Sequence, residues 1–280
     1  MKISAVFFDI DGTLVTHQAK ALASTKESIA QLKSQGIICG LATGRGPVRL
    51  DEQVDQLALD VFVTYNGQYV YTRDQVLYAN AFPVDLVTKI AAYCDQNKRQ
   101  ILFGSNDELA GSSIMSIGQK AWAKRLQRFL PKARNSLFFK KIAQKISRTG
   151  NKQRYQDLAI LRKPIYQCVL ISPESEQPIL EKLFPECKFT RSNPYTVDII
   201  MKRNSKSVGI QKVGQHLGFT LDQCMAFGDS WNDTEMLQSV GLGVAMGNAN
   251  EDIKLLADYV TTSNTEDGIY NALRHYNIIK

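Results

Sequence analysis

The chain has few of the residues that mark disulfide-rich, zinc-binding or membrane-spanning proteins. Its five cysteines lie far apart and form no pair at zinc-ligand spacing, so we expect buried thiols in a reducing compartment. Its three histidines lie outside every motif discussed below. No apolar run approaches the roughly 20 residues of a membrane helix, and the first residues do not resemble a signal peptide. We therefore expect a cytoplasmic globular protein that makes no membrane contact.

Acidic residues are missing between Glu108 and Asp157, a stretch that holds twelve of the 34 lysines and arginines. The net charge of +7 comes from this stretch, and the rest of the chain is net negative. Aromatic residues lie among the basic ones, so segment 119–154 could contact nucleic acid or another polyanion. Trp122, Leu126 and Phe129 also lie at near-helical spacing, which favours a helix with an apolar side toward a core and a solvated basic side.

Strand-like and helix-like segments alternate at both ends of the chain. In the first part we expect buried strands at 3–8, 37–42 and 61–64, with helices at 24–36 and 47–57. Ser24 and Glu27 have the spacing of a capping box at the first helix. After residue 201 we expect helices at 205–216, 232–239, 251–257 and 268–275, with strands at 223–227, 242–245 and 259–262. This alternation predicts an α/β fold with a doubly wound parallel sheet.

The pattern between these two parts is different. Two alternating strands around Arg73-Asp74 predict a hairpin over 68–79. Beyond it, a helix at 84–95, strands at 100–103, 165–171, 188–191 and 196–201, and a helix at 176–184 follow in mixed order. Mixed order is typical of an α+β module with an antiparallel sheet. We expect residues 1–81 and 202–280 to form a core domain and residues 82–201 an inserted domain.

Two carboxylates, Asp9 and Asp11, come directly after the first buried strand and precede Gly12. Open α/β sheets place their sites at the carboxyl ends of strands. One carboxylate there can attack phosphorus or bind a metal while the other transfers a proton. Asp-Gly is also a common turn, and the motif alone indicates a turn about as readily as a site. The buried strand before it favours the site.

Further polar residues follow other strand ends or begin helices. Thr43 and Gly44 offer a hydroxyl and a backbone N–H to a phosphate oxygen. Lys206 begins a helix and could neutralise a phosphoryl group, although such a lysine is more often solvated. Asp229 ends a strand and Asp233 lies one helical turn later, so the two could bind a hard cation such as Mg²⁺. Carboxylates in a first helical turn can also be caps, but the strand before them favours a metal site.

In this order and at these positions, the motifs resemble those of the haloacid dehalogenase-like (HAD) hydrolases. The Asn66-Gly67 pair and segments 228–233 and 259–268 are similar to the Cof-type branch, in which an α/β cap is inserted into a Rossmann-like core. The resemblance covers essentially the whole chain. Ser207 follows Lys206 where the family often has glycine, and Trp231 occupies the variable place of the fourth motif.

The resemblance implies a magnesium-dependent phosphatase of small phosphorylated metabolites such as sugar phosphates, nucleotides or phosphorylated cofactors. Asp9 would be the nucleophile that becomes an aspartyl phosphate, and Asp11 the general acid and base. Mg²⁺ would be bound by the Asp9 carboxylate, the Asp11 carbonyl and Asp229, with Asp233 in the outer shell. The phosphoryl oxygens would be bound by Thr43, the N–H groups of Ile10 and Gly44, Lys206 and Asn232.

Two alternatives share parts of this pattern. A phosphomutase would use the same covalent step. A polyanion-binding or nucleic-acid-binding protein would use the basic segment 119–154, with the catalytic residues vestigial.

Overall fold

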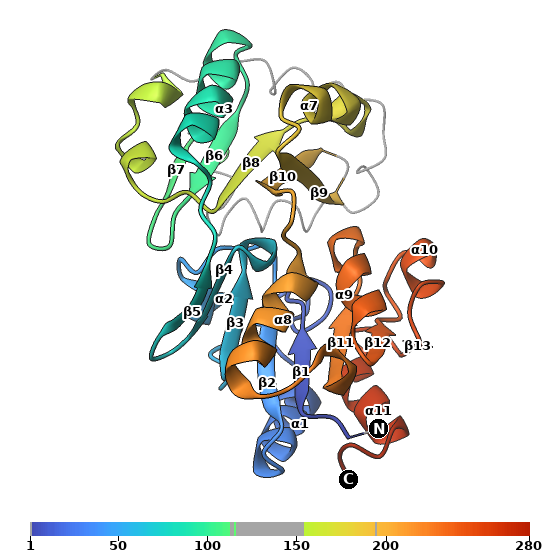
Figure 1. Ribbon diagram of the computed structural model, residues 1–280. Helices are drawn as coiled ribbons and strands as arrows, with labels where there is room; N and C mark the ends of the chain where they lie inside the picture. The colour runs from blue at the N-terminus through green and yellow to red at the C-terminus, as the bar shows by residue number, and fades with distance from the viewer. Residues whose placement is uncertain (1, 113–114, 116–153, 194) are drawn as a thin grey trace. The chain divides into compact units, whose positions relative to one another are not determined.

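A computed structural model of the protein describes residues 2–112, 115, 154–193 and 195–280 (Figure 1). It has two compact units: residues 1–79 with 204–280, called here the core unit, and residues 80–203, called the inserted unit. Of the basic segment 119–154, only Arg154 belongs to the described residues. The helices expected in that segment, and its proposed polyanion contact, therefore lie outside them.

The core unit is built on an eight-stranded sheet with the order β13-β12-β11-β1-β2-β3-β4-β5. Neighbouring strands from β13 to β3 are parallel, whereas β4 and β5 form the antiparallel edge. The strands are β1 (Ala5–Phe8), β2 (Ile38–Ala42), β3 (Val61–Thr64), β4 (Tyr69–Thr72), β5 (Val76–Ala79), β11 (Cys224–Gly228), β12 (Leu242–Ala245) and β13 (Tyr259–Val260). The predicted α/β fold with a parallel sheet is confirmed, and the predicted hairpin extends that same sheet.

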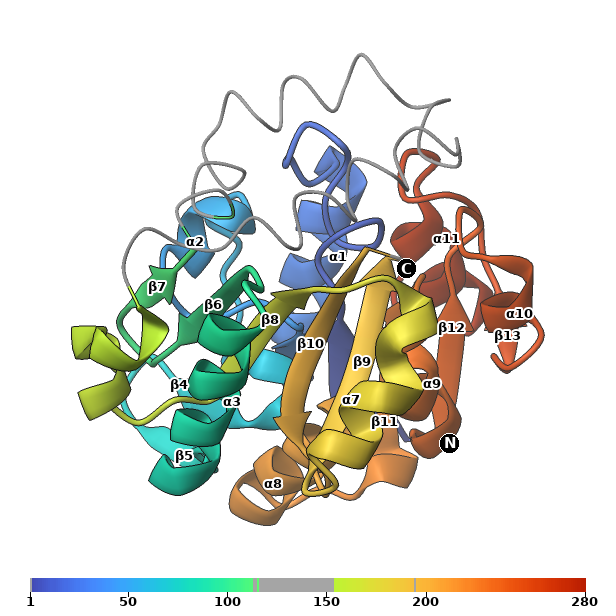
Figure 2. The same cartoon turned by 90° about the horizontal axis from the view of Figure 1, so that it is seen from above.

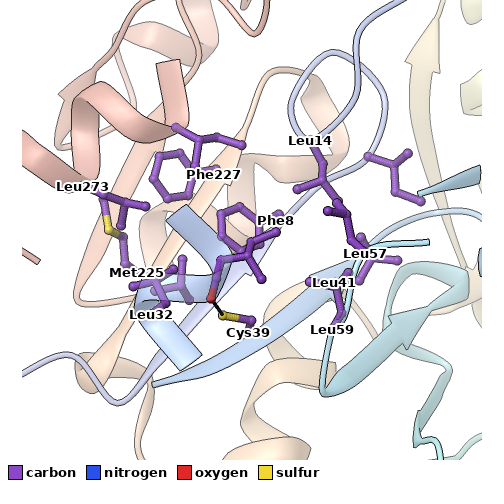
Figure 3. Close-up of a cluster of buried hydrophobic side chains, with 14 of the residues drawn as sticks. Phe8, Leu14, Leu32, Cys39, Leu41, Leu57, Leu59, Met225, Phe227 and Leu273 are labelled. Atoms are coloured by element: carbon purple, nitrogen blue, oxygen red, sulfur yellow. Dashed lines mark hydrogen bonds between the residues drawn. The ribbon is translucent and has the colours of Figure 1, made fainter. Parts of the chain in front are cut away.

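Helices cover both faces of this sheet. They are α1 (Ala23–Ser34), α2 (Leu50–Gln53), α8 (Lys206–Leu217), α9 (Thr234–Ser239), α10 (Glu251–Lys254) and α11 (Gly268–His275). Successive β1 side chains point to opposite faces: Phe8 belongs to the apolar cluster that includes residues of α1 and α11, and Phe7 to the cluster that includes residues of α8 and α9. Figure 3 shows the first cluster, in which the rings of Phe8 and Phe227 stack 5.4 Å apart.

Two helix predictions in the core unit need correction. The helix expected at 47–57 is only α2, because Arg49, Asp55 and Gln56 adopt left-handed φ angles of 54–55° that no α-helix accommodates. Ser24 is not a helix cap, since α1 begins at Ala23 and no side chain caps it. The Ser24 hydroxyl instead donates a hydrogen bond to Asp267 Oδ1 at 2.5 Å. Local spacing did not reveal this long-range partner.

The inserted unit has a five-stranded antiparallel sheet with the order β7-β6-β8-β10-β9. The strands are β6 (Ile101–Gly104), β7 (Leu109–Gly111), β8 (Gln167–Ile171), β9 (Cys187–Asn193) and β10 (Thr196–Met201). Helices α3 (Val84–Gln96) and α7 (Gln177–Leu183) cover one face of this sheet (Figure 1, Figure 2). Their apolar side chains form one cluster with alternate residues of β6, β8 and β10. Strand β7 was not predicted.

The cysteines agree with the expectation from composition. All five cysteines are buried as free thiols. Among the helices that the structure describes, none is long and apolar enough to cross a membrane.

The packing of α1 predicts the energetic weight of one of its side chains. Leu32 is completely buried in the cluster of Figure 3. Leu32→Ala should lower the free energy of unfolding by about 2–5 kcal/mol, because it removes buried apolar surface and leaves a cavity. Leu217→Ala is the matched control, since Leu217 is 42% exposed, and it should change stability by no more than about 0.5 kcal/mol. Urea unfolding of the three proteins gives the comparison, and equal losses would contradict the assigned packing.

Candidate active site

Four parallel strand ends meet at one edge of the core sheet. In the order β11-β1-β2-β3 they are followed by Asp229, Asp9, Thr43 and the Tyr65–Gly67 turn. Backbone hydrogen bonds continue past the strands, because Asp9 N donates to Phe227 O at 3.0 Å and Thr43 N donates to Val63 O at 2.9 Å. The loops are therefore fixed to the sheet where their polar side chains begin.

A buried lysine lies between two of the carboxylates at this edge. Lys206 Nζ donates to Asp9 Oδ1 at 2.5 Å and to Asp233 Oδ1 at 2.6 Å. Its side chain is 1% exposed, and those of Asp9 and Asp233 are 8% and 0% exposed. Lys206 begins α8 next to Ser205, whose hydroxyl accepts a hydrogen bond from Val208 N at 3.3 Å and caps the helix. The lysine is thus paired with two acids and not solvated.

The loop after β11 holds Asp229 and Asp233. Asp233 Oδ2 accepts hydrogen bonds from the backbone N–H groups of Asp229 at 3.1 Å and Ser230 at 3.0 Å. Asp233 therefore caps this turn and binds Lys206 through its other oxygen. Asp229 Oδ1 accepts a hydrogen bond from Thr13 Oγ1 at 3.2 Å. Gly12 must be a glycine here, because its φ is +82° and a Cβ would lie 2.3 Å from Asp229 Oδ2.

Burial and mutual repulsion raise the pKa values of two acids in this cluster. Burial raises the pKa of Asp9 to about 7, although the Lys206 ammonium acts in the opposite direction. Burial, together with the Asp9 and Asp233 carboxylates, raises the pKa of Asp229 to about 8. Burial alone would lower the pKa of Lys206, but the two carboxylates raise it above its ordinary value. At Asp9 and Asp229, burial and the neighbouring carboxylates therefore outweigh the Lys206 ammonium and disfavour the ionised acids.

The acids could hold a metal ion. Asp9, Asp229 and Asp233 each offer a carboxylate oxygen, and the three oxygens lie within 4.8 Å of one another. Hard divalent cations prefer such oxygen ligands, and a bound cation would favour the ionised form of these carboxylates. The donor set therefore fits a divalent cation. Asp233 is the least free of the three to bind it directly, because Lys206 binds its Oδ1 and two backbone N–H groups bind its Oδ2.

Asp11 lies apart from this cluster of carboxylates. Its side chain is 63% exposed and is bound by the guanidinium of Arg45. Arg45 Nε donates to Asp11 Oδ2 at 2.7 Å and Nη2 donates to Oδ1 at 2.6 Å. No role was predicted for Arg45. A basic side chain directly after Thr43-Gly44, at the carboxyl edge of the sheet, was the signal that could have indicated one.

The remaining predicted residues lie in the loops around the same edge. Ile10 is fully buried, and its carbonyl accepts a hydrogen bond from Val15 N at 3.1 Å. The Thr43 hydroxyl accepts one from Arg45 N at 3.1 Å, and Gly44 lies between these two residues. Asn232 Oδ1 accepts from Ser230 Oγ at 2.7 Å.

Two further contacts in these loops were not predicted. Asn232 Nδ2 donates to Asn66 Oδ1 at 3.5 Å, which links the loop after β11 to the turn after β3. Asn248 Nδ2 donates to Gly12 O at 2.8 Å. These contacts join residues 166 and 236 positions apart, so no local pattern predicts them.

The chain is similar to known proteins of one family. Residues 6–273 match the haloacid dehalogenase-like hydrolases. The Bacillus subtilis (strain 168) protein YkrA is 30% identical over 280 residues, covering 100% of both chains. The pyridoxal phosphate phosphatase YbhA of Escherichia coli (strain K12) is 28% identical over 274 residues, covering 96% of this chain and 97% of that one.

A solved structure agrees. The HAD subclass IIB sugar phosphatase BT4131 is 30% identical and superposes with a TM-score of 0.78, covering 99% of this chain and 100% of that one. The site and these relatives lead to one conclusion: the chain belongs to the haloacid dehalogenase-like hydrolases and is a phosphoric monoester hydrolase of that family.

Proposed function

We propose that the protein is a magnesium-dependent phosphatase of small phosphorylated metabolites that forms an aspartyl phosphate on Asp9. The buried Lys206 ammonium, held between Asp9 and Asp233 beside Asp229, is the observation that carries this proposal. A phosphate dianion repels a carboxylate nucleophile, so attack requires positive charge close to both groups. Lys206 supplies one such charge, and bound Mg²⁺ would supply more by offsetting charge on the nucleophile and the phosphoryl oxygens.

The first half-reaction transfers the phosphoryl group to Asp9. A carboxylate oxygen of Asp9 attacks phosphorus, and the bond from phosphorus to the substrate oxygen breaks. Asp11 gives its proton to that oxygen, so the leaving group departs as a neutral alcohol. The Asp9 acyl phosphate and the Asp11 carboxylate remain.

The second half-reaction restores the enzyme. Water attacks phosphorus, the Asp11 carboxylate takes a proton from it, and the bond between phosphorus and the Asp9 oxygen breaks. Inorganic phosphate leaves, and Asp9 is a carboxylate again. In this proposal Asp9, Asp229 and the Asp11 carbonyl hold Mg²⁺, with Asp233 behind them.

Lys206, Asn232, Thr43 and the N–H groups of Ile10 and Gly44 bind the phosphoryl oxygens. This proposal is supported by their common position at the carboxyl edge of the sheet, where the loops after β1, β2 and β11 begin. The names of the relatives support a small substrate: one is a pyridoxal phosphate phosphatase and another a sugar phosphatase.

Asp9→Asn should abolish phosphate release. The amide is the same size but is a poor nucleophile, so kcat for p-nitrophenyl phosphate with Mg²⁺ should fall by a factor on the order of 10³ or more. Asp222→Asn is the matched control, because Asp222 is exposed just before β11 at the opposite edge of the sheet. It should retain full activity. EDTA should stop turnover of the wild type, and added Mg²⁺ should restore it.

Undiminished turnover by Asp9→Asn would refute the proposed nucleophile. Product analysis separates the sister activity, since a phosphomutase would return the phosphoryl group to a second position of the substrate and release little inorganic phosphate.

The raised pKa values predict how stability depends on pH when metal is absent. Unfolded aspartates lose their protons near the ordinary value of 3.8, whereas folded Asp9 and Asp229 keep theirs to about 7 and 8. The folded state binds the extra protons in this interval, so the free energy of unfolding should fall as pH rises through it. The slope is about 1.4 kcal/mol per pH unit for each extra proton bound.

Mg²⁺ should raise the free energy of unfolding much more at pH 8 than at pH 5, because it binds the ionised carboxylates. Asp229→Asn removes one of the titrating groups and a metal ligand. Its stability should depend less steeply on pH, and its response to Mg²⁺ should be weaker. Urea titrations with and without Mg²⁺ give both quantities. Identical pH slopes for the variant and the wild type would show that Asp229 does not titrate as described.

A further inference from the structure

Asp11 has an unusual position for the residue that must transfer protons. A 63% exposed aspartate side chain would normally move among several rotamers. Here the guanidinium of Arg45 contacts both oxygens, at 2.6 and 2.7 Å. A two-point contact of this kind fixes the plane of the carboxylate as well as its position. Arg45 therefore sets the direction in which Asp11 presents its oxygens.

Arg45 is itself held at several points. Its backbone N–H donates to Thr43 Oγ1 at 3.1 Å, and its carbonyl accepts from Tyr65 N at 3.0 Å. Its remaining nitrogen, Nη1, donates to Gln53 Oε1 of α2. The loop also runs directly against Tyr65, since a Cβ on Gly46 would lie 2.1 Å from the Tyr65 hydroxyl. The main chain of Arg45 is thus fixed at the end of the sheet, and its guanidinium is held by α2.

Gln53 is fixed in turn. Its amide nitrogen donates to Val48 O at 3.2 Å, so its oxygen is turned toward Arg45. The chain of contacts runs from α2 through Gln53 and Arg45 to Asp11. Isolated surface ion pairs contribute little, but a bidentate pair supported from behind on both sides is the arrangement that positions a side chain.

We propose that Arg45, supported by Gln53, is a positioning residue that orients the Asp11 carboxylate for hydrolysis of the aspartyl phosphate. The inference rests on the proposed function. The two-point contact is one that a guanidinium makes with a carboxylate, which is the form of Asp11 in the second half-reaction. There water attacks phosphorus, the Asp11 carboxylate accepts a proton from that water, and the Asp9–phosphate bond breaks to regenerate the Asp9 carboxylate.

The inference separates the two half-reactions. With p-nitrophenyl phosphate the leaving group needs no proton, so the first half-reaction should not depend on Arg45. A misdirected general base should slow the second half-reaction roughly ten- to hundredfold. Arg45→Gln should therefore show a burst of nitrophenol, followed by a slow steady state in which the phosphorylated enzyme accumulates. Rapid acid quenching followed by assay of protein-bound phosphate measures the accumulation.

Further variants make the test specific. Gln53→Ala removes only the support and should cause a smaller accumulation of the same kind. Arg45→Lys keeps the charge without the two-point contact and should recover part of the rate. Arg49→Gln is the matched control, because Arg49 lies four residues away and its guanidinium pairs with Glu52 at 3.2 Å. It should behave like the wild type.

A double variant tests whether Arg45 acts through Asp11. In an Asp11→Asn background, Arg45→Gln should cost no further activity, since the group it positions is gone. An equal loss in both backgrounds would overturn the inference, as would a rise in KM with kcat unchanged, which would indicate direct substrate binding. An unchanged steady-state rate in Arg45→Gln would also overturn it, because the contact would then be a surface ion pair without a role in catalysis.

Failure of the proposed function gives a different result. If the wild type releases no phosphate, or Asp9→Asn is as active as the wild type, the aspartyl phosphate mechanism fails and the role of Arg45 fails with it. If Asp9→Asn is inactive while Arg45→Gln and Gln53→Ala turn over at the wild-type rate, only the role of Arg45 is refuted.

Discussion

The ion pairs of Lys206 with Asp9 and Asp233 are the interactions on which the rest of the site depends. Removing an ammonium and two carboxylates from water is costly, and the cost is recovered only where the charges meet at hydrogen-bond distance. These distances, 2.5 and 2.6 Å, require the start of α8, the end of β1 and the turn after β11 to converge on one point. The same contacts place Asp9 and Asp233 beside Asp229, where the three carboxylates could hold a divalent cation.

Topology explains how the lysine reaches this point. The chain re-enters the core unit at Asn204, two residues before Lys206. Asn204 Nδ2 donates to Gln68 Oε1 at 3.1 Å, and its Oδ1 accepts from the Tyr78 hydroxyl at 3.4 Å, so the re-entering chain is tied to the antiparallel edge of the sheet. Ser205 then caps α8 and fixes the direction in which the lysine leaves the helix. These contacts, which position Lys206, lie within the core unit.

The sequence was sufficient to predict the fold and the strand ends that carry Asp9, Thr43 and Asp229, because buried strands and periodic helices leave strong local patterns. It was insufficient where long-range contacts decide the structure. The bond from Ser24 to Asp267 spans 243 residues, and the pairing of Arg45 with Asp11 spans 34, so neither leaves a local pattern. Left-handed residues shortened α2 for a reason that apolar spacing does not encode. The double use of Asp233, as a cap and as a partner of Lys206, also became visible only in three dimensions.

The central claim is that Asp9 carries the phosphoryl group during turnover. The most direct measurement is mass spectrometry of acid-quenched, borohydride-reduced wild-type enzyme after mixing with p-nitrophenyl phosphate and Mg²⁺. Borohydride reduces an acyl phosphate and leaves a free carboxylate intact, so the modified residue reveals where phosphate was attached. The account predicts reduction at Asp9 alone, dependent on substrate and absent from Asp9→Asn. Reduction at another aspartate, or an unmodified Asp9 in an enzyme that is turning over, would contradict it.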